Sequence, residues 1–449
     1  CVMSATLEAA PLAGYLDAPT LRSEGRRFDV TVEHAEREDA RRLEEQVTGA
    51  VKRLCAAGLD GDVLVFLPGA GEIRRAMESL ASFAASAQLE LHALHGELSP
   101  EEQDRAVKPG PRRKVIVATN VAETSLTIPG VRAVVDAGLA RVARFDPHRG
   151  IDTLLIEPVS QASAEQRAGR AGRTGPGRCI RLWSQTDHAA RPLRETPEIK
   201  RVDLSETILL LLTSGWGDAT TFPWYEKPDD KALQRALTVL RDLGAVDHAG
   251  ALTRLGRRMA VFPAHPRYAR MLMAAGEFGC VAEVARIAGL SQGRDILFRK
   301  VDDRTENARD AVAQEDGSDF FTRLALLRRA AEMKFDLDGC ERLGIHAQSA
   351  RQADQAARQF LRIAEGQGLP VNDAPADPAA LRRCLLLGFS DRLAIRLDAG
   401  TLRCALVHGR KGELRRESAV RHAKLLVAAE IDEIQARGEV TTYLSLCAA

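Results

Sequence analysis

Short apolar runs alternate with helical patterns along the first part of the chain. The runs are rich in Val, Ile and Leu, most of them end near Gly, Pro, Asn or Asp, and they occupy residues 62–67, 89–94, 114–118, 131–136 and 179–183. Nearly continuous apolar strands of this kind are typical of a parallel sheet that helices cover on both faces. Between two of the runs, apolar residues recur at helical spacing, at Ile73, Met77, Leu80 and Phe83. The pattern therefore predicts a doubly wound α/β domain over residues 25–185.

Residues 138–156 interrupt this alternation. Two extended segments flank a turn that contains Pro147 and Gly150, which predicts a β-hairpin. Arg141, Arg144 and Arg149 give this hairpin a basic surface. A basic hairpin can bind nucleic acid or can be a solvated surface element, and the pattern by itself leaves both interpretations open.

Helical patterns dominate from residue 186 onward. Asp230 is a suitable cap for a helix that ends at Gly244, and a short turn follows, so we expect a winged-helix-like domain over residues 186–255. Residues 256–370 carry the spacing of a helical bundle. Gly, Pro, Asp and Asn are then frequent around residues 366–378, which suggests a linker. Short β-like runs over residues 371–449 predict a small OB-like region, a partial β-barrel that the end of the chain leaves incomplete.

Composition places the chain among ordinary globular proteins of several domains. It has 449 residues, of which 45% are hydrophobic and 28% charged. The longest aliphatic run, residues 208–212, is far below the roughly 18 residues that a membrane-spanning helix needs. Lys and Arg number 63 and Asp and Glu 62, which excludes a uniformly basic coat protein but allows local basic patches. The eight scattered cysteines lack zinc-knuckle spacing and fit a reducing cytoplasm, where we expect the protein to reside as a monomer.

The segment Gln166-Arg-Ala-Gly-Arg-Ala-Gly-Arg173 is the strongest chemical signal. It spaces Arg167, Arg170 and Arg173 three apart on one face of a helix, with small residues between them. Each glycine weakens a helix by roughly 1 kcal/mol, and the three guanidinium groups repel one another. A bound anion would compensate for both costs, since planar guanidinium groups match phosphate oxygens. The competing interpretation is a solvated basic helix.

A second polar segment follows the apolar run that ends at Ala118. Residues 119–128 carry several hydroxyl groups at the carboxyl end of a strand, which is where doubly wound sheets bind ligands. Thr119, Thr124, Ser125 and Thr127 could donate to phosphate oxygens or hold a water, although such a turn is often just a helix cap. A third segment, Ser4-Ala5-Thr6, has no meaning by itself.

Taken in order, these segments resemble the DEAH-box branch of the superfamily 2 helicases. Residues 4–6 resemble motif III, which links two RecA-like domains, residues 119–128 resemble motif V, and residues 166–173 resemble motif VI. The hairpin at 138–156 occupies the place of the strand-separating hairpin of that branch. Residues 222–246 resemble its winged helix, and residues 263–267 open a segment like its ratchet bundle. Residues 389–393 and 408–412 most resemble the bacterial HrpB-type helicases.

The resemblance implies roles for individual residues. Gln166, Arg170 and Arg173 would be catalytic, as a sensor and arginine fingers at the γ-phosphate of ATP. Ser125, Thr127 and Arg167 would contact the nucleotide. Thr119, Asn120 and the hairpin residues Arg141, Arg144 and Arg149 would bind nucleic acid, and Ser4 and Thr6 would couple the two domains. Val107 and Pro129 stand where many relatives carry an aromatic and an acidic residue for the base and ribose, so selectivity for ATP could be relaxed.

Two expected motifs are missing from the chain. It contains no Gly-x-x-x-x-Gly-Lys-Ser/Thr segment for the phosphates and no Asp-Glu-x-His segment for Mg²⁺. In the family both precede motif III, so residues 1–24 are expected to be the remnant of a first RecA-like domain in a truncated chain. The alternative is a natural protein that lost its ATPase half. We expect no metal ligands in this chain and no ATP hydrolysis by it alone.

The resemblance therefore implies a 3′-to-5′ ATP-dependent helicase that acts on single-stranded RNA or DNA, with ATP and Mg²⁺ as cofactors. One alternative is a non-catalytic nucleic-acid-binding or scaffolding protein, which would bind nucleic acid without ATPase activity. Another is a RecA-like ATPase that does not act on nucleic acid, against which the basic hairpin and the winged helix argue. The sequence does not distinguish RNA from DNA.

Overall fold

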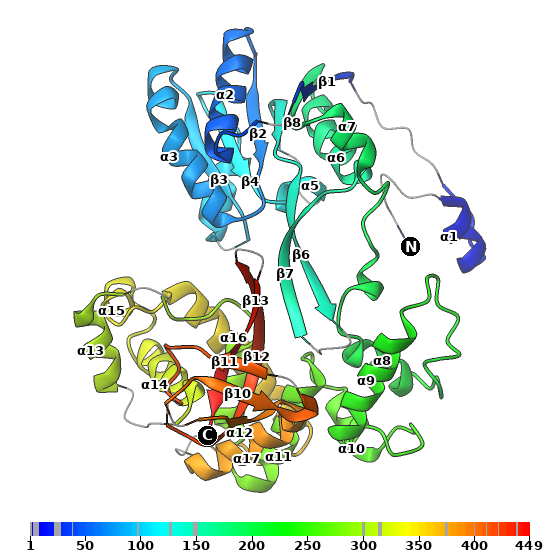
Figure 1. Cartoon of the computed structure of the whole chain (residues 1–449), viewed down its shortest axis with the longest axis vertical. Helices are drawn as coiled ribbons and strands as arrows, with labels where there is room; N and C mark the ends of the chain where they lie inside the picture. The colour runs from blue at the N-terminus through cyan, green and yellow to red at the C-terminus, as the bar shows by residue number, and fades with distance from the viewer. Residues whose placement is uncertain are drawn as a thin grey trace. The chain divides into compact units, whose positions relative to one another are not determined.

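The computed structural model describes residues 2, 9–21, 28–37, 39–96, 98–124, 128–146, 151–298, 301–312, 317–372, 376–398, 400–409, 411–420, 422–436 and 439–449. The chain divides into two compact units (Figure 1). The first comprises residues 1–144 and 154–198, and the second comprises residues 145–153 and 199–449. Among the described residues, no helix combines the length and apolar character needed to cross a membrane.

A six-stranded parallel sheet is the centre of the first unit. Its strand order is β1-β8-β5-β2-β4-β3, and the strands are β1 Val30–Ala35, β2 Asp62–Phe66, β3 Glu90–Leu94, β4 Lys114–Ala118, β5 Val131–Asp136 and β8 Gly177–Ser184. Five of these strands coincide with the apolar runs. The predicted doubly wound α/β fold is therefore confirmed.

Helices cover both faces of this sheet because alternate strand residues point to opposite sides. Val63 and Val65 of β2 pack with α2 (Leu43–Ala56) and α3 (Ala70–Ser86) on one face. Leu64 and Phe66 pack on the other face with alanines of four short elements: α4 (Pro100–Val107), α5 (Val121–Thr124), α6 (Gln161–Ala168) and the 3₁₀ helix η1 (Gly169–Gly172). Figure 1 shows α3 and α6 on opposite sides of the sheet.

The edge strand β1 was not among the predicted strands. Its sequence, Val-Thr-Val-Glu-His-Ala, alternates apolar and polar residues, and none of its residues is fully buried. A strand at the edge of the sheet has less apolar cover than the central ones, which explains why the sequence of β1 is not a continuous apolar run.

The predicted hairpin is confirmed as a two-stranded sheet of β6 (Leu139–Asp146) and β7 (Ile151–Pro158). Its turn, residues 147–150, lies outside the described residues. Gly138 starts the hairpin with φ +68°, and a Cβ atom there would lie 2.6 Å from the ring of Trp183. Glycine is therefore required at the point where the chain leaves the sheet.

The second unit begins with helices. They are α8 Ser205–Thr213, α9 Asp230–Asp242, α10 Arg254–Met259, α11 Pro266–Phe278, α12 Val281–Leu290, α13 Asp303–Val312, α14 Asp319–Glu332, α15 Leu337–Arg342, α16 Ala347–Gly366 and α17 Pro378–Gly388. Gly244 turns the chain after α9 with φ +71°, and a bridge between Val246 and Leu252 makes a minimal wing before α10. The boundaries at residues 186, 256 and 371 stay predictions. The remaining helices of the two units are α1 Ala9–Leu16, α7 Gln185–Ala190, η2 Glu198–Lys200, η3 Ser390–Arg392 and η4 Val407–Gly409.

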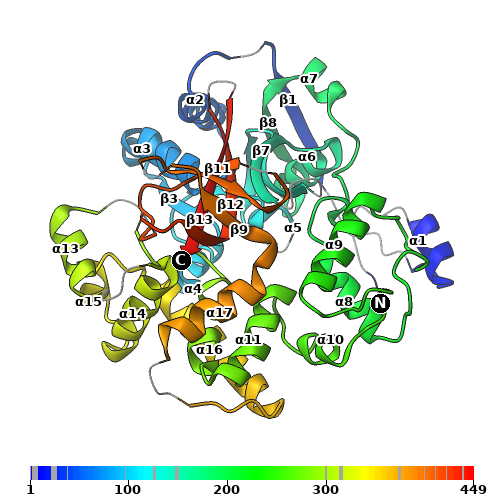
Figure 2. The same cartoon turned by 60° about the horizontal axis from the view of Figure 1, so that its bottom comes forward.

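The C-terminal strands form a closed barrel rather than the partial one expected from the sequence. The strand order is β10-β11-β13-β12-β9, and the strands are β9 Leu393–Arg396, β10 Arg403–Leu406, β11 Lys411–Leu414, β12 Leu425–Ala436 and β13 Glu439–Ala448. Closure depends on the parallel pairing of β11 with β13, and neither strand carries a strong apolar run. Figure 2 shows the barrel beside α17, and their contact buries apolar residues of both.

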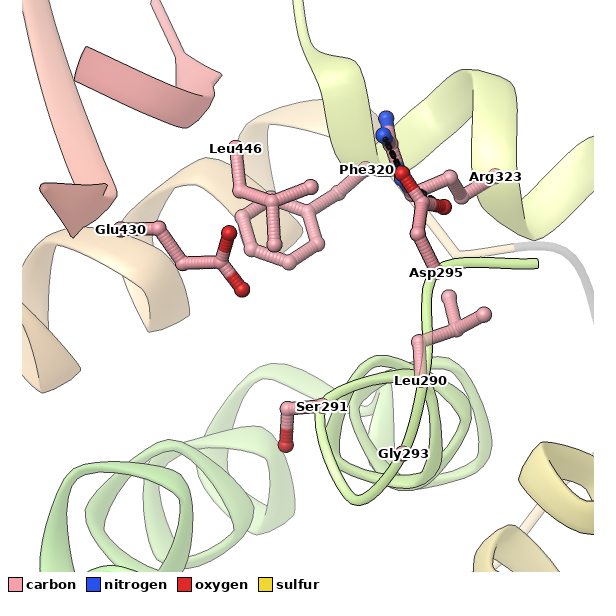
Figure 3. A pocket seen from close by; sticks show the side chains of 8 residues that line it. All are labelled: Leu290, Ser291, Gly293, Asp295, Phe320, Arg323, Glu430 and Leu446. Atoms are coloured by element: carbon pink, nitrogen blue, oxygen red, sulfur yellow. Dashed lines mark hydrogen bonds and ion pairs between the residues drawn. The ribbon is translucent and has the colours of Figure 1, made fainter. Parts of the chain in front are cut away.

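A small cavity lies where the bundle and the barrel meet (Figure 3). Apolar and polar side chains line it: Leu290, Ser291, Gly293, Asp295, Phe320, Arg323, Glu430 and Leu446. The pair Arg323 and Asp295 closes one side, with Nη2 and Oδ2 2.6 Å apart.

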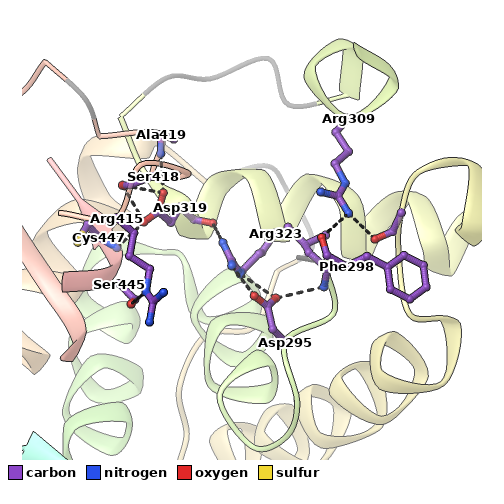
Figure 4. Close-up of polar contacts among 12 residues, drawn as sticks. Asp295, Phe298, Arg309, Asp319, Arg323, Arg415, Ser418, Ala419, Ser445 and Cys447 are labelled. Carbon is purple, nitrogen blue, oxygen red and sulfur yellow. Dashed lines mark hydrogen bonds and ion pairs between the residues drawn. The ribbon is translucent and has the colours of Figure 1, made fainter. Parts of the chain in front are cut away.

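Asp319 at the start of α14 ties the bundle to the barrel (Figure 4). Its carboxylate accepts hydrogen bonds from the Ser418 hydroxyl at 3.0 Å and from the backbone amides of Ala419 and Cys447 at 2.7 and 2.8 Å. Asp319 is buried, so these donors replace the water that its carboxylate loses on folding. The closed barrel is therefore anchored by polar contacts as well as by apolar packing.

Candidate functional site

The polar segment after β4 lies at the carboxyl edge of the sheet, as the sequence indicated. The amide of Thr119 donates to the carbonyl oxygen of Leu94 at 3.1 Å, which continues the sheet by one residue. The Thr119 carbonyl then accepts from Ala122, and the Asn120 carbonyl accepts from Glu123, so the chain turns directly into the short helix α5. Thr119 is half-buried and Asn120 is exposed.

Arg167 lies inside the first unit. Its side chain is 1% exposed, its Nε donates to Oε2 of Glu123 at 2.9 Å, and its Nη1 donates to Oδ1 of Asp136 at 3.0 Å. The guanidinium also lies 5.0 Å from the centre of the Phe66 ring. Burial opposes the charge, but the two carboxylates outweigh it and raise the pKa of Arg167. Arg167 therefore links its own helix α6 to α5, β5 and β2, and its guanidinium does not face solvent.

Arg170 occupies the next turn, where the α-helix has tightened into η1. It is 6% exposed, and its Nη2 donates to the backbone carbonyl of Glu123. Burial, with a smaller effect from the positive charge of Arg173, lowers the pKa of Arg170 to about 10. The guanidinium therefore stays charged at neutral pH, close to a second cation.

Arg173 follows η1 and is exposed, while Gln166 on α6 is half-buried. The three arginines thus do not share one exposed helical face, as their spacing had suggested. The reason is that Glu123 and Asp136 draw Arg167 into the domain and that the helix changes from α to 3₁₀ at Gly169. The burial of Arg167 and Arg170 also excludes the interpretation of a solvated basic helix.

One of the two helix-weakening glycines has a clear packing role. A Cβ atom on Gly172 would lie 2.5 Å from the carbonyl oxygen of Phe28, and the Phe28 amide donates to the Gly172 carbonyl at 3.0 Å. A Cβ atom on Gly169 would meet nothing within 4 Å. The structure therefore explains Gly172 by close backbone approach and gives no such explanation for Gly169.

Glu123 and Asp136 are site residues that were not among the candidates. Asp136 is fully buried, its Oδ1 also accepts from the Gly138 amide at 2.8 Å, and its Oδ2 has no hydrogen-bond partner among the described residues. A weak signal existed for both, since each is an acidic residue at the end of a buried strand or in the turn after it. The arginine partner lies 44 and 31 residues away, and the sequence pattern does not disclose that pairing.

The described hairpin arginines both have acidic neighbours. Nε and Nη2 of Arg144 each donate to the carboxylate of Glu157 at 2.6 Å, and this hydrogen-bonded pair raises the pKa of Arg144. Arg141 lies 3.7 Å from the carboxylate of Glu72 and is nearly half exposed. The hairpin therefore carries positive charge that is partly balanced from within the protein.

Several candidates fall outside the described residues: Ser4, Thr6, Ser125, Thr127 and Arg149. Of the two positions linked to base and ribose contacts, Val107 packs against the core of the sheet and Pro129 is exposed. Within the part of the chain that the structure describes, no group of three or more His, Cys, Asp or Glu residues is arranged to hold a metal ion.

Three family models match this chain. Residues 47–175 match the Helicase conserved C-terminal domain. Residues 236–264 match the winged-helix part of the Helicase associated domain (HA2), and residues 265–360 match its ratchet-like part.

Named relatives agree with these models. The chain is 33% identical over 413 residues to the ATP-dependent RNA helicase HrpA of Escherichia coli, a match that covers 88% of this chain and 32% of that protein. It is 34% identical over 405 residues to the pre-mRNA-splicing factor ATP-dependent RNA helicase prp22 of Schizosaccharomyces pombe, covering 88% and 35%. The crystal structure of the E. coli DExH-box NTPase HrpB matches with a TM-score of 0.77 and 31% identity, over 100% of this chain and 49% of that one. The chain thus spans about a third of the length of these curated relatives and about half of the solved chain.

Proposed function

We propose that this chain, which belongs to the DEAH-box superfamily 2 helicases of the HrpA and HrpB type, supplies the arginine-bearing half of an ATP-dependent nucleic-acid helicase. Its six-stranded sheet acts as the second of two RecA-like domains. ATP is bound against a partner RecA-like domain that provides the phosphate-binding loop, since this sequence has no Gly-x-x-x-x-Gly-Lys-Ser/Thr segment.

The observation that carries this proposal is the placement of Arg170 and Arg173. Arg170 donates a hydrogen bond to the backbone carbonyl of Glu123, one turn after the buried ion pairs of Arg167. Burial and, to a smaller extent, the neighbouring positive charge of Arg173 lower the pKa of Arg170. Two neighbouring guanidinium groups, of which that of Arg170 is held by a backbone carbonyl, fit the oxygens of a triphosphate, and such arginines stabilise the charge that develops in phosphoryl transfer. We assign both to the γ-phosphate of ATP.

The other nucleotide-binding assignments follow the motif. Gln166, Ser125 and Thr127 would sense the γ-phosphate or orient the attacking water. Arg167, to which the resemblance also assigned a nucleotide contact, is buried and paired with Glu123 and Asp136, so we assign it the role of holding its neighbours in position. Mg²⁺ bound with ATP would neutralise phosphate charge. The described residues offer no cluster of ligands for that ion, so we place its ligands in the partner domain, to which Ser4 and Thr6 would couple.

Single-stranded nucleic acid is the proposed substrate. Thr119 and Asn120 lie at the sheet edge where motif V binds the phosphate backbone, and the hairpin with Arg141, Arg144 and Arg149 would separate the strands as the chain moves 3′ to 5′. Contacts to phosphates make such binding weakly sequence-specific and sensitive to salt. We propose RNA as the first substrate to test, because the relatives HrpA and prp22 are named RNA helicases.

The direct test is ATP hydrolysis by the complete protein that contains this chain, with and without single-stranded RNA or DNA. We expect nucleic acid to stimulate hydrolysis by the complete protein and expect residues 1–449 alone to show none. Binding of nucleic acid without any ATPase activity in the complete protein would instead support a non-catalytic binding or scaffolding role.

A further inference from the structure

We propose that Glu123 is the positioning residue that couples the nucleic-acid-binding turn after β4 to the arginine fingers. This inference rests on the proposed function, since it concerns how Arg170 is held for phosphoryl transfer. Glu123 belongs to α5, which begins two residues after Thr119. It is therefore close in sequence to the segment assigned to nucleic acid and in direct contact with the segment assigned to ATP.

Glu123 contacts the arginine segment through two different groups. Its carboxylate accepts from Nε of Arg167 at 2.9 Å, and its backbone carbonyl accepts from Nη2 of Arg170. The first contact holds the end of α6, and the second holds η1. A displacement of α5 therefore moves both acceptors together and changes the position of the Arg170 guanidinium.

Other parts of the domain hold both elements as well. Arg167 is anchored by Asp136 at 3.0 Å and by the carbonyl of Leu139 at 3.2 Å. The far side of η1 is anchored by Gly172, which packs directly on the backbone of Phe28. With these points held, Glu123 is a contact through which the sheet-edge turn can act on Arg170.

The charge of the Glu123 carboxylate matters because its partner is buried. The Glu123 side chain is 15% exposed and that of Arg167 is 1% exposed. A charged hydrogen bond in such surroundings is shorter and about twice as strong as a neutral one. Glu123→Gln keeps the size and one acceptor but removes the charge, so Arg167 relaxes toward Asp136 and the end of α6 shifts.

The test measures ATP turnover by the complete protein in the presence of single-stranded RNA. We expect Glu123→Gln to lower kcat by about 10- to 100-fold, the cost of a displacement of around an ångström at a catalytic group. The KM for ATP should change by less than about twofold, because the contact positions a group for the transition state rather than for ground-state binding.

The matched control is Glu165→Gln. Glu165 lies on α6, the helix that carries Arg167, and pairs with another buried arginine, Arg181, at 2.7 Å. We expect this variant to keep the wild-type kcat. Thermal unfolding of both variants reports whether they fold.

A second comparison separates positioning from general stability. In a protein that already carries Arg170→Lys, adding Glu123→Gln should lower kcat by a further factor of less than about two. Both changes act through the side chain at position 170, so their effects should not multiply. Multiplicative losses would overturn the proposal, as would a wild-type kcat for Glu123→Gln in an active protein. If Glu123→Gln does not fold, Glu123→Asp withdraws the carboxylate by one methylene, and an unchanged kcat in that variant overturns the proposal equally. A wild-type protein without ATPase activity overturns the proposed function and this role with it.

Discussion

Arg144 and Glu157 form a two-point ion pair across the β6–β7 hairpin, with both nitrogen–oxygen distances 2.6 Å. Cross-strand pairs of opposite charge stabilise a hairpin. This pair keeps a guanidinium in place on an element that projects from the sheet, where it remains more than one-third exposed. The hairpin can therefore present positive charge without losing its register.

We predict that replacing Arg141, Arg144 and Arg149 with Ala impairs unwinding more than ATP hydrolysis in the complete protein. Each arginine that contacts a phosphate should remove about one unit from the slope of log affinity against log salt concentration. Unwinding of a tailed duplex and RNA binding at several salt concentrations measure these effects. Glu157→Gln is the control, since it removes the acidic partner but keeps Arg144. Unwinding that is unaffected in the triple variant would exclude a role for the hairpin.

The second prediction concerns a buried ion pair in the second unit. Asp391 accepts from Nη1 and Nη2 of Arg267 at 2.5 and 2.9 Å, and from Arg235 of α9 at 3.0 Å. Asp391→Ala leaves Arg267 buried without its carboxylate, so the free energy of unfolding should fall by about 3–5 kcal/mol. Urea denaturation measures it. The surface variant Glu332→Ala, which removes an exposed partner of Arg329, should cost less than about 1 kcal/mol.

Acid should weaken the same pair. Burial would raise the pKa of Asp391, but the arginines outweigh it and hold the pKa far below the ordinary value of 3.8. A carboxyl with a depressed pKa in the folded state contributes stability above its unfolded pKa and loses it as the pH falls. This contribution is therefore complete above about pH 5 and decreases below it. Asp391→Ala should remove that part of the acid dependence.

A third prediction concerns two histidines near the edge of the sheet in the first unit. Nη1 of Arg181 lies 3.3 Å from Nε2 of both His34 and His188. Burial, and then the positive charge of Arg181, lowers the pKa of each histidine below 6.5. The unfolded chain therefore binds more protons than the folded chain near pH 6, and stability should fall as the pH falls through 6.5.

Thermal unfolding between pH 7.5 and 5.5 tests this histidine pair. We expect the melting temperature to fall with pH in this window, above the range in which Asp391 titrates. His34→Gln with His188→Gln should flatten the decrease, and His248→Gln, at an exposed position, should not. An equal slope in the wild type and the double variant would contradict the prediction.

The sequence predicted the central sheet well because its strands are nearly uninterrupted apolar runs. It did not predict β1 or the closure of the barrel, because both depend on strand pairs that are distant in sequence. β1 is stabilised by pairing with β8, and β13 closes the barrel through β11. Pairing of this kind is a property of the folded chain, and local periodicity does not report it.

The sequence likewise predicted only part of the candidate site. The position of Thr119 at the carboxyl end of β4 followed from the strand pattern. The burial of Arg167 did not, because it depends on carboxylates from α5 and β5 that fold against α6. The spacing of the three arginines fits an arrangement in which all of them are exposed on one helical face. It fits equally well an arrangement in which the first of them, Arg167, points into the domain. The acidic residues Glu123 and Asp136, rather than the arginines, decide between these two arrangements.

The most direct test of the proposed function compares ATP hydrolysis by the complete protein and its Arg170→Ala variant, with and without single-stranded RNA. Arginine fingers contribute about 10³-fold or more to phosphoryl transfer. We therefore predict RNA-stimulated hydrolysis in the wild type and a loss of about 10³-fold in kcat in the variant. Arg178→Ala, at a half-buried arginine paired with Glu33 at 2.6 Å, should retain wild-type turnover. An Arg170→Ala protein that hydrolyses ATP at the wild-type rate would contradict the account.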